Sequence, residues 1–373
     1  MSQKEVYALH TDLKESTTTA KSYSIKEDNE QVLAYITYEQ SFYILKVVKN
    51  SNYLKLLQFD ANLSLVSSTL LNFSDQKFFN RHNEKTDLYS VLREETRKES
   101  SMVTPIVANQ RTSLIKASAK RKLYVFDSNL YITLDNSKLR TICLSVNLLT
   151  KQTNTQVFNQ NYDISKSLIF DSNSFMFDDK LIQASFTREY INFIIRDLAG
   201  VPIKTFRLDK KEKADFLIGD ISKISDNAFG RDKASSFTKT KRFLFNMMDY
   251  NAQAIAAYPY EDSYILTFGG VSDLKKTLTP GRDIFAYLMV SPNRTSIFNE
   301  YYNATAMIAT GALTRELEPN PTLTLPEDKL ADLRYYNNFD PKDPKYKVVF
   351  KVKDQYYYGK QETGSKTLDL VSF

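Results

Sequence analysis

The residue types that most often carry catalysis or bind metals are scarce in this chain. Only two histidines occur among its 373 residues, His10 and His82, and neither has a partner at the spacing of a pair of metal ligands. The single cysteine, Cys143, lies in the apolar run Thr141–Val146, where a small buried side chain is expected. One cysteine also excludes a disulfide within the chain. The sequence therefore predicts no metal site, no thiol chemistry and no cofactor.

Two residue pairs could contribute to a site, the acidic pair Asp178-Asp179 and the glycine pair Gly269-Gly270. A carboxylate pair hydrolyses glycosides only when a second acid faces the first across a cleft, so a hairpin turn is the simpler interpretation of Asp178-Asp179. A glycine pair allows the backbone to approach a ligand closely, but a turn or bulge after the strand 263–268 is again simpler. No nucleophile elbow or phosphate-binding glycine loop occurs. We therefore predict no catalytic residue and a protein that is not an enzyme.

Aromatic residues are abundant, with 24 tyrosines, 24 phenylalanines and no tryptophan. The basic segment 239–242 precedes Phe243 and Phe245, a combination that binds single-stranded nucleic acid in some proteins, but one short cluster is a weak signal in so aromatic a chain. Tyr356–Tyr358 resembles a sugar-stacking platform, whereas alternation along a strand would divide these rings between core and surface. The formal net charge of +6 is too small to predict a nucleic-acid partner.

Strands, rather than catalytic motifs, dominate the pattern of the chain. Groups of four alternating segments recur at 31–74, 122–158 and 174–208, and further strands are expected at 252–259, 263–268, 345–352, 355–360 and 368–373. Four short strands in roughly 40–50 residues is the spacing of a β-propeller blade. Because only nine glycines occur, Asn, Asp and Ser must supply the turns, as in 50–52, 127–129 and 171–173.

This pattern predicts an all-β, propeller-like fold of about seven four-stranded blades in one domain, residues 1–373. Insertions near 76–120, 209–250 and 310–345 interrupt it and contain a few short helices. One helix is expected to be capped by Thr86, and another begins with the capping box formed by Thr324 and Glu327. Residues 1–30 are expected to form either an extended lead-in or the closing strand of the last blade.

Three segments resemble uncharacterised exported proteins of Flavobacteria-type Bacteroidota, namely 213–232, 249–255 and 265–272. The resemblance includes no catalytic residue, and it implies a location in the periplasm or at the outer membrane. In size and composition the chain also resembles a soluble, plug-like component of the type 9 secretion translocon. Residues 1–4 resemble the start of exported chains from which a signal peptide has been removed. As it stands, however, the sequence shows no apolar leader or membrane-spanning run, which favours the alternative of a cytoplasmic protein.

Together these observations predict a non-enzymatic protein-interaction subunit of a bacterial cell-envelope complex. By resemblance, it would occlude or accompany an outer-membrane protein-secretion channel. The expected partners are proteins of an outer-membrane complex and not nucleic acid, and the three insertions are the expected partner surface. The alternative is a glycan-binding or glycan-processing propeller, which would use acids and tyrosines at its central channel.

Overall fold

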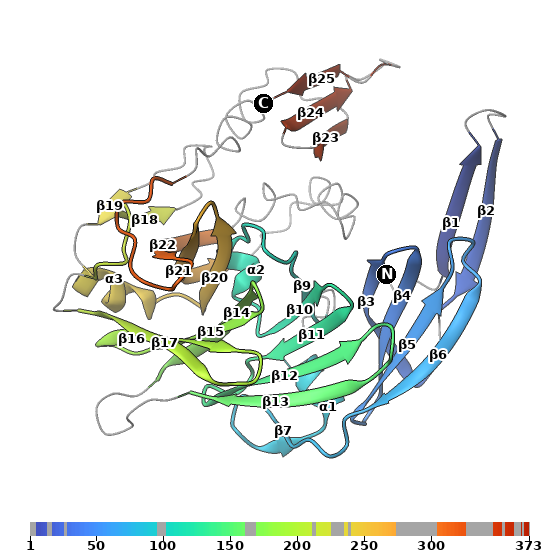
Figure 1. Cartoon of the computed structure of the whole chain (residues 1–373), viewed down its shortest axis with the longest axis horizontal. Coiled ribbons are helices and arrows are strands. Elements are labelled where there is room, and N and C mark those ends of the chain that lie inside the picture. The colour runs from blue at the N-terminus through green and yellow to red at the C-terminus, as the bar shows by residue number, and fades with distance from the viewer. Residues whose placement is uncertain are drawn as a thin grey trace.

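The fold is all-β and propeller-like, built from antiparallel sheets that follow one another in chain order. Figure 1 shows these sheets around an arc, from β3–β6 on the right to β18–β22 on the left. The computed structural model describes residues 5–12, 17–25, 28–94, 102–160, 169–210, 214–224, 235–237, 240–273, 304–325, 346–352, 355–361, 367 and 369–372. Within these ranges no helix combines the length and the apolar character that crossing a bilayer requires.

The first sheet has the strand order β3-β4-β5-β6 and confirms the strand group predicted at 31–74. Its strands are Glu30–Tyr38 (β3), Ser41–Val48 (β4), Tyr53–Phe59 (β5) and Leu65–Asn72 (β6). Asn50, at φ 53°, makes the predicted turn between β4 and β5, because asparagine tolerates the left-handed region without glycine. Alternation places Leu54 and Leu56 in the core shared with the second sheet, and Leu57 and Phe59 on the opposite face.

The second and third sheets confirm the groups predicted at 122–158 and 174–208. The second sheet contains Thr104–Pro105 (β9), Arg121–Phe126 (β10), Asn129–Leu134 (β11), Arg140–Asn147 (β12) and Thr153–Asn159 (β13). The third contains Asp171–Phe177 (β14), Lys180–Phe186 (β15), Tyr190–Asp197 (β16) and Pro202–Asp209 (β17). The turn predicted at 171–173 is wrong. These residues begin β14, where the Asp171 carboxylate accepts a hydrogen bond from Lys120 Nζ at 2.6 Å.

The fourth sheet departs from simple chain order, with the strand order β19-β18-β22-β21-β20. Its strands are Ile221–Ile224 (β18), Ser235–Phe237 (β19), Ala252–Tyr260 (β20), Ser263–Asp273 (β21) and Ala304–Thr314 (β22). The turn or bulge predicted at Gly269-Gly270 is wrong, because β21 continues through both glycines and pairs with β22. A Cβ on Gly269 would lie 1.8 Å from the Met307 carbonyl oxygen, so the close backbone approach is to the neighbouring strand.

The remaining strands form smaller sheets. The fifth sheet contains Tyr346–Val352 (β23), Gln355–Gln361 (β24) and Asp369–Ser372 (β25), which confirms the predicted terminal strands. Glu5–Asp12 (β1) and Thr17–Ser24 (β2) form an antiparallel hairpin, so the expectation of a lead-in or a single closing strand for residues 1–30 is wrong. Phe78–Phe79 (β7) pairs with Lys85–Thr86 (β8).

The described residues include three short helices: Leu88–Arg93 (α1), Leu114–Ala117 (α2) and Thr240–Met247 (α3). The cap of α1 is Asp87 and not Thr86, since the Asp87 carboxylate accepts a hydrogen bond from Ser90 N at 2.9 Å. The capping box predicted at Thr324 lies largely outside the described residues. In the predicted insertion 76–120, α1 and α2 bury apolar side chains such as Leu92 and Leu114 in the core.

A buried polar network connects the second and third sheets. The Asp135 carboxylate pairs with Lys122 Nζ at 3.0 Å and accepts hydrogen bonds from Thr141 Oγ1 and from both N and Oγ of Ser174. Thr141 Oγ1 in turn accepts from Gln183 Nε2 at 3.2 Å. Lys122 and Asp135 are 0% and 1% exposed, so these charges are stabilised by their partners rather than by water.

Candidate functional site

Residues with the potential for nucleophilic or metal chemistry are not assembled into a site in the described part of the chain. Cys143 is buried in β12, as predicted, and burial raises the pKa of its thiol to about 12. His82 lies in the turn between β7 and β8 and accepts a hydrogen bond from Arg81 Nε at 3.1 Å. Within the described ranges, no three acidic, histidine or cysteine side chains gather where they could hold a metal ion.

The acidic pair Asp178-Asp179 forms the hairpin turn between β14 and β15, as predicted. Both residues have left-handed φ values, 43° and 56°, as a two-residue hairpin turn requires. The Asp178 carboxylate accepts a hydrogen bond from the Tyr264 hydroxyl and lies 3.4 Å from an Arg315 guanidinium nitrogen. Lys180 Nζ lies 3.7 Å from the same carboxylate, so the partners of Asp178 are a phenol and two cations that anchor the turn.

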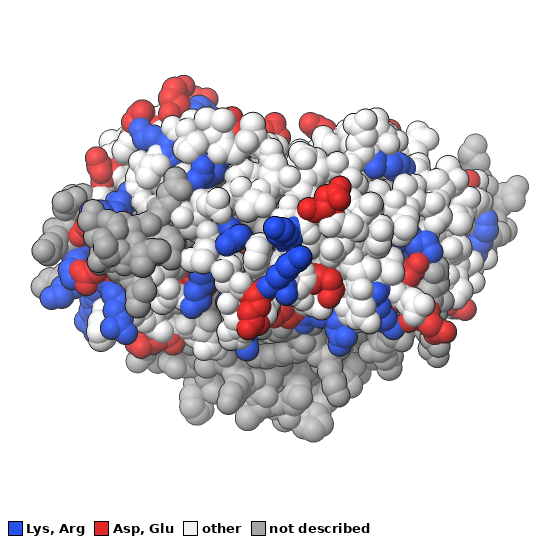
Figure 2. All heavy atoms as spheres, turned by 90° about the horizontal axis from the view of Figure 1, so that it is seen from below, with Lys and Arg blue, Asp and Glu red and all other residues white. Residues whose placement is uncertain are grey.

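The aromatic residues that could bind a base or a sugar are also divided between core and surface. In α3, Phe243 is fully buried whereas Phe245 is 65% exposed, so these rings do not form one stacking surface beside the basic segment 239–242. In β24, Tyr358 is buried and Tyr357 is half-buried, in keeping with the predicted alternation. Figure 2 shows Lys and Arg interspersed with Asp and Glu on the face in view, without a continuous basic stripe.

The outer face of the first sheet carries a small buried apolar cluster of its own. We use this name for the side of β3–β6 that faces away from the second sheet. Its small apolar cluster consists of Ile25, Ile44, Leu57, Phe59 and Leu63, with Val6, Tyr23, Val32, Tyr35 and Phe42 packed against it. The aromatic rings form a ladder, in which Tyr35 stacks on Phe42 and the ring centroid of Phe42 lies 6.0 Å from that of Phe59. In the described chain, only the β1–β2 hairpin and Ile25 add side chains to this cluster from outside the sheet.

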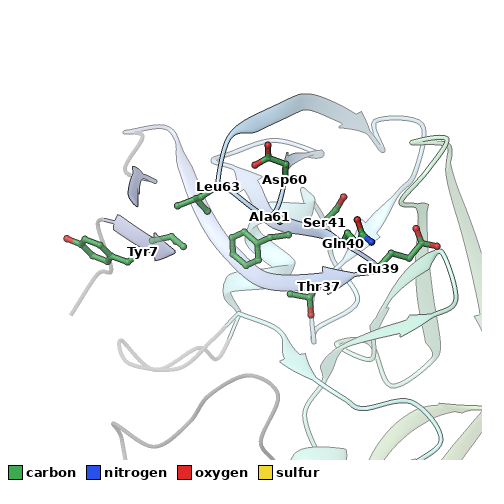
Figure 3. A pocket seen from close by; sticks show the side chains of 10 residues that line it. Tyr7, Thr37, Glu39, Gln40, Ser41, Asp60, Ala61 and Leu63 are labelled. Carbon is green, nitrogen blue, oxygen red and sulfur yellow. The ribbon is translucent and has the colours of Figure 1, made fainter. Parts of the chain in front are cut away.

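A pocket of about 320 Å³ opens at one end of the outer face, between the β1–β2 hairpin and two turns of the sheet. Val6 and Tyr7 line it from β1, and the other lining residues are Thr37, Glu39, Gln40, Ser41, Phe42, Asp60, Ala61 and Leu63. Figure 3 shows Tyr7 at one end of this row and Glu39 at the other, with Asp60 and Ala61 between them. The lining therefore combines apolar side chains from the hairpin and the sheet with the carboxylates of Glu39 and Asp60.

Two left-handed residues shape the turns that bound the pocket. Glu39, at φ 51°, lies in the two-residue turn between β3 and β4, and Leu63, at φ 55°, lies in the turn between β5 and β6. The Asp60 carboxylate holds the second turn, because its Oδ1 accepts hydrogen bonds from Asn62 N at 2.9 Å and Ser64 N at 2.8 Å. Both turn bonds are accepted by Oδ1, so the second carboxylate oxygen of Asp60 can accept a hydrogen bond from a ligand.

The edge of the first sheet exposes more apolar side chain than the edge strand β13 of the second sheet, which is also uncharged but exposes only Val157 among its large apolar residues. β6 is an edge strand that contains no charged residue, and Leu65, Val66 and Leu70 on it are 46%, 60% and 59% exposed. The outer strand of the third sheet, β17, instead carries Lys204 and Arg207, which are the kind of residues that keep an edge from pairing with another chain. A bulge opposite Gln58 and Phe59 interrupts only the start of β6, so the regular part of the edge, residues 67–72, is open to pairing.

Comparisons with known proteins give general structural likeness without a close relative. The sequence matches no family model, and no curated protein matches it. One similar solved structure is the WD40 domain of SCAP from fission yeast, with 10% identity over 98% of this chain and 69% of that chain and a TM-score of 0.28. Another is a member of the DUF4221 family from Bacteroides vulgatus, with 13% identity over 88% of this chain and 74% of that chain and a TM-score of 0.30. A third is an α-L-arabinofuranosidase from Clostridium thermocellum, with 11% identity over 87% of this chain and 80% of that chain and a TM-score of 0.27. No activity or partner follows from likenesses this distant.

Sequence reasoning did not find the pocket or the edge of β6. Residues 39–40 and 60–63 carry the signature of turns, and nothing local in the sequence shows that two turns and the β1–β2 hairpin surround one cavity. The edge could have been recognised from the absence of charge in Leu65–Asn72, since the strand itself was correctly predicted.

Proposed function

We propose that this chain is a non-enzymatic protein-interaction subunit of the bacterial cell envelope, and that its partner adds a strand to the edge of β6. The observation that carries the proposal is the uncharged edge itself, with three exposed apolar side chains on one strand. An added strand would pair with the free N–H and C=O groups of β6, and its side chains would cover Leu70 and Val66.

The envelope location and the kind of complex rest on sequence resemblance. The segments 213–232, 249–255 and 265–272 resemble exported proteins of Bacteroidota. On this basis the partner is a protein of an outer-membrane complex, and the chain occludes or accompanies a protein-secretion channel in that complex. Fractionation of the native cell tests the location, because recovery of the chain with cytoplasmic markers alone would contradict this part of the proposal.

Site-specific photocrosslinking in the native cell tests the interaction. A photoreactive phenylalanine analogue replaces Leu70 on β6 in one variant and Leu149, 60% exposed in the turn between β12 and β13, in a matched control. We expect a discrete adduct with an outer-membrane protein from position 70 and none from position 149. The absence of a discrete adduct at position 70, or the same adducts at both positions, would refute the proposed use of β6.

The pocket favours a second candidate, a glycan-binding protein. Tyr7 and Phe42 present aromatic surface beside Glu39, Gln40 and Asp60, and such groups recognise the apolar faces and the hydroxyl groups of sugars. A glycan array probed with the full chain tests this candidate. It predicts binding of a defined glycan that is lost in Tyr7→Ala, and an array without any signal would dispose of it.

A further inference from the structure

The pocket on the outer face combines an apolar channel with charged groups of one sign. Every charged residue in its lining is acidic, namely Glu39 and Asp60, although the chain as a whole has a formal net charge of +6. A third carboxylate, Glu5, accepts a hydrogen bond from the hydroxyl of Tyr7. Within the described part of the chain, neither Glu39 nor Asp60 forms an ion pair, although the Tyr38 side chain hydrogen-bonds to Glu39, so neither carboxylate is neutralised by a cation of the chain.

The lining of the pocket restricts the chemistry of that ligand. Val6, Phe42 and Leu63 give it apolar walls, which favour a hydrocarbon segment in contact with them. The carboxylates at the rim favour a cation at the end of such a segment. A divalent ion fits less well, because among the described residues no third acidic, histidine or cysteine side chain joins Glu39 and Asp60.

We propose that the pocket binds the side chain of a lysine or arginine from the partner polypeptide. The aliphatic stem lies against Phe42 and Leu63, and the cationic head reaches Glu39 or Asp60. This inference deepens the proposed function and rests on it, since it identifies the partner as a protein segment with an exposed basic residue.

Two neighbouring features support a site formed before the ligand arrives. The aromatic ladder fixes one wall, because Phe42 is held between Tyr35 and Phe59. The Asp60 carboxylate is held in place by the backbone N–H groups of Asn62 and Ser64. A carboxylate and an aromatic wall that are already ordered lose little conformational freedom when a side chain binds.

Ligand-observed NMR with the full chain tests this inference. The probes are capped pentapeptides Gly-Ser-X-Ser-Gly, in which X is lysine, arginine, norleucine or glutamate, at millimolar concentration. We expect saturation transfer to the lysine and arginine peptides, at least tenfold weaker binding of the norleucine and glutamate peptides, and a loss of binding as salt is raised. Equal binding of the lysine and norleucine peptides, or no binding of either, would overturn the inference.

Variants of the pocket separate this inference from the proposed function. In Glu39→Gln/Asp60→Asn the pocket loses both charges, and the asparagine oxygen still accepts the two turn hydrogen bonds, so the fold is retained. We expect this variant to bind the lysine peptide at least tenfold more weakly. The matched control Glu84→Gln, an exposed acid in the turn between β7 and β8, leaves binding unchanged.

Each combination of results has a distinct meaning. Unchanged binding in the double variant, or binding of a neutral glycan in place of the lysine peptide, overturns the inference. A crosslink from position 70 without lysine-peptide binding retains the proposed function and rejects this site. Lysine-peptide binding without any crosslink from position 70 supports the pocket and rejects the use of the β6 edge.

Discussion

Removal of the charge of Asp135 should destabilise the protein far more than removal of a surface charge. This carboxylate is buried between the second and third sheets and accepts from Lys122, Thr141 and Ser174. In Asp135→Asn, the amide nitrogen cannot accept a hydrogen bond, so whichever way the amide is turned, one set of donors loses its acceptor. The Lys122 ammonium also loses its counter-ion in a site that water does not reach.

The expected magnitude follows from this environment. Removal of one partner from a buried ion pair costs about 3–5 kcal/mol in free energy of unfolding. For 373 residues, an unfolding entropy of about 2.1 cal/mol/K per residue converts this loss to a decrease in Tm of about 4–6 °C for one cooperative transition. The matched control is Glu318→Gln, because Glu318 is 62% exposed and pairs with Lys204 at 2.7 Å. Loss of the Glu318 charge should lower the free energy of unfolding by less than about 1 kcal/mol.

A double-mutant cycle measured by urea unfolding tests the reasoning. Lys122→Met alone leaves the Asp135 charge buried without its cation, and it should lower the free energy of unfolding nearly as much as Asp135→Asn does. The combined variant removes both charges and should therefore be more stable than the sum of the two losses predicts, by about 1–3 kcal/mol. The reasoning is refuted if the two losses simply add, or if Asp135→Asn costs no more than Glu318→Gln.

Two further predictions concern single residues. Burial raises the pKa of Cys143 from 9.0 to about 12. At pH values between these two pKa values, the unfolded chain releases a proton that the folded chain keeps. The free energy of unfolding therefore falls by about 1.4 kcal/mol for each unit by which the pH rises. Urea unfolding at pH 8 and pH 10 should show this extra loss in the native chain and not in Cys143→Ala; the same loss in both would contradict the assignment. Gly269→Ala should destabilise the chain by about 1–3 kcal/mol or more, because its Cβ would meet the Met307 carbonyl. Thermal unfolding should show a smaller loss for Gly219→Ala, where φ is +68° but no atom lies within 4 Å, and the reverse order would refute the steric argument.

The strands could be predicted because their signals are local. The group predicted at 122–158 contains the observed strand Asn129–Leu134, since alternation of apolar residues and a turn at Asp127 both lie within a few residues of the strand. The hairpin at Asp178-Asp179 was correct for the same reason. The predicted cap of α1, Thr86, lies one residue before the observed cap, Asp87, because both side chains can cap a helix.

The errors arose where a distant partner decides the local structure. Residues 171–173 have a turn composition, but the contact of Asp171 with Lys120, which is distant in sequence, keeps them in a strand. Gly269 is typical of a strand end by its local sequence, but the strand needs a glycine there because the Met307 carbonyl of the neighbouring strand lies close to its Cα. The pocket is the extreme case, because Tyr7, Glu39 and Asp60 come from three separate hairpins and no local pattern connects them. The predicted single domain, the blade number and the role of the insertions stay predictions.

The strand order of the fourth sheet has a consequence for folding kinetics. The first three sheets are built mainly from consecutive hairpins, which form on a timescale of about 1–10 μs because their partners are close in sequence. In the fourth sheet, Ser222 of β18 must find Ile308 of β22, and the whole β20–β21 hairpin lies between them in the chain. Closure of so long a loop is entropically costly, so this pairing should come late. Until it does, apolar residues of the third sheet such as Phe206, which packs on Phe216 just before β18, stay open to water and to other chains.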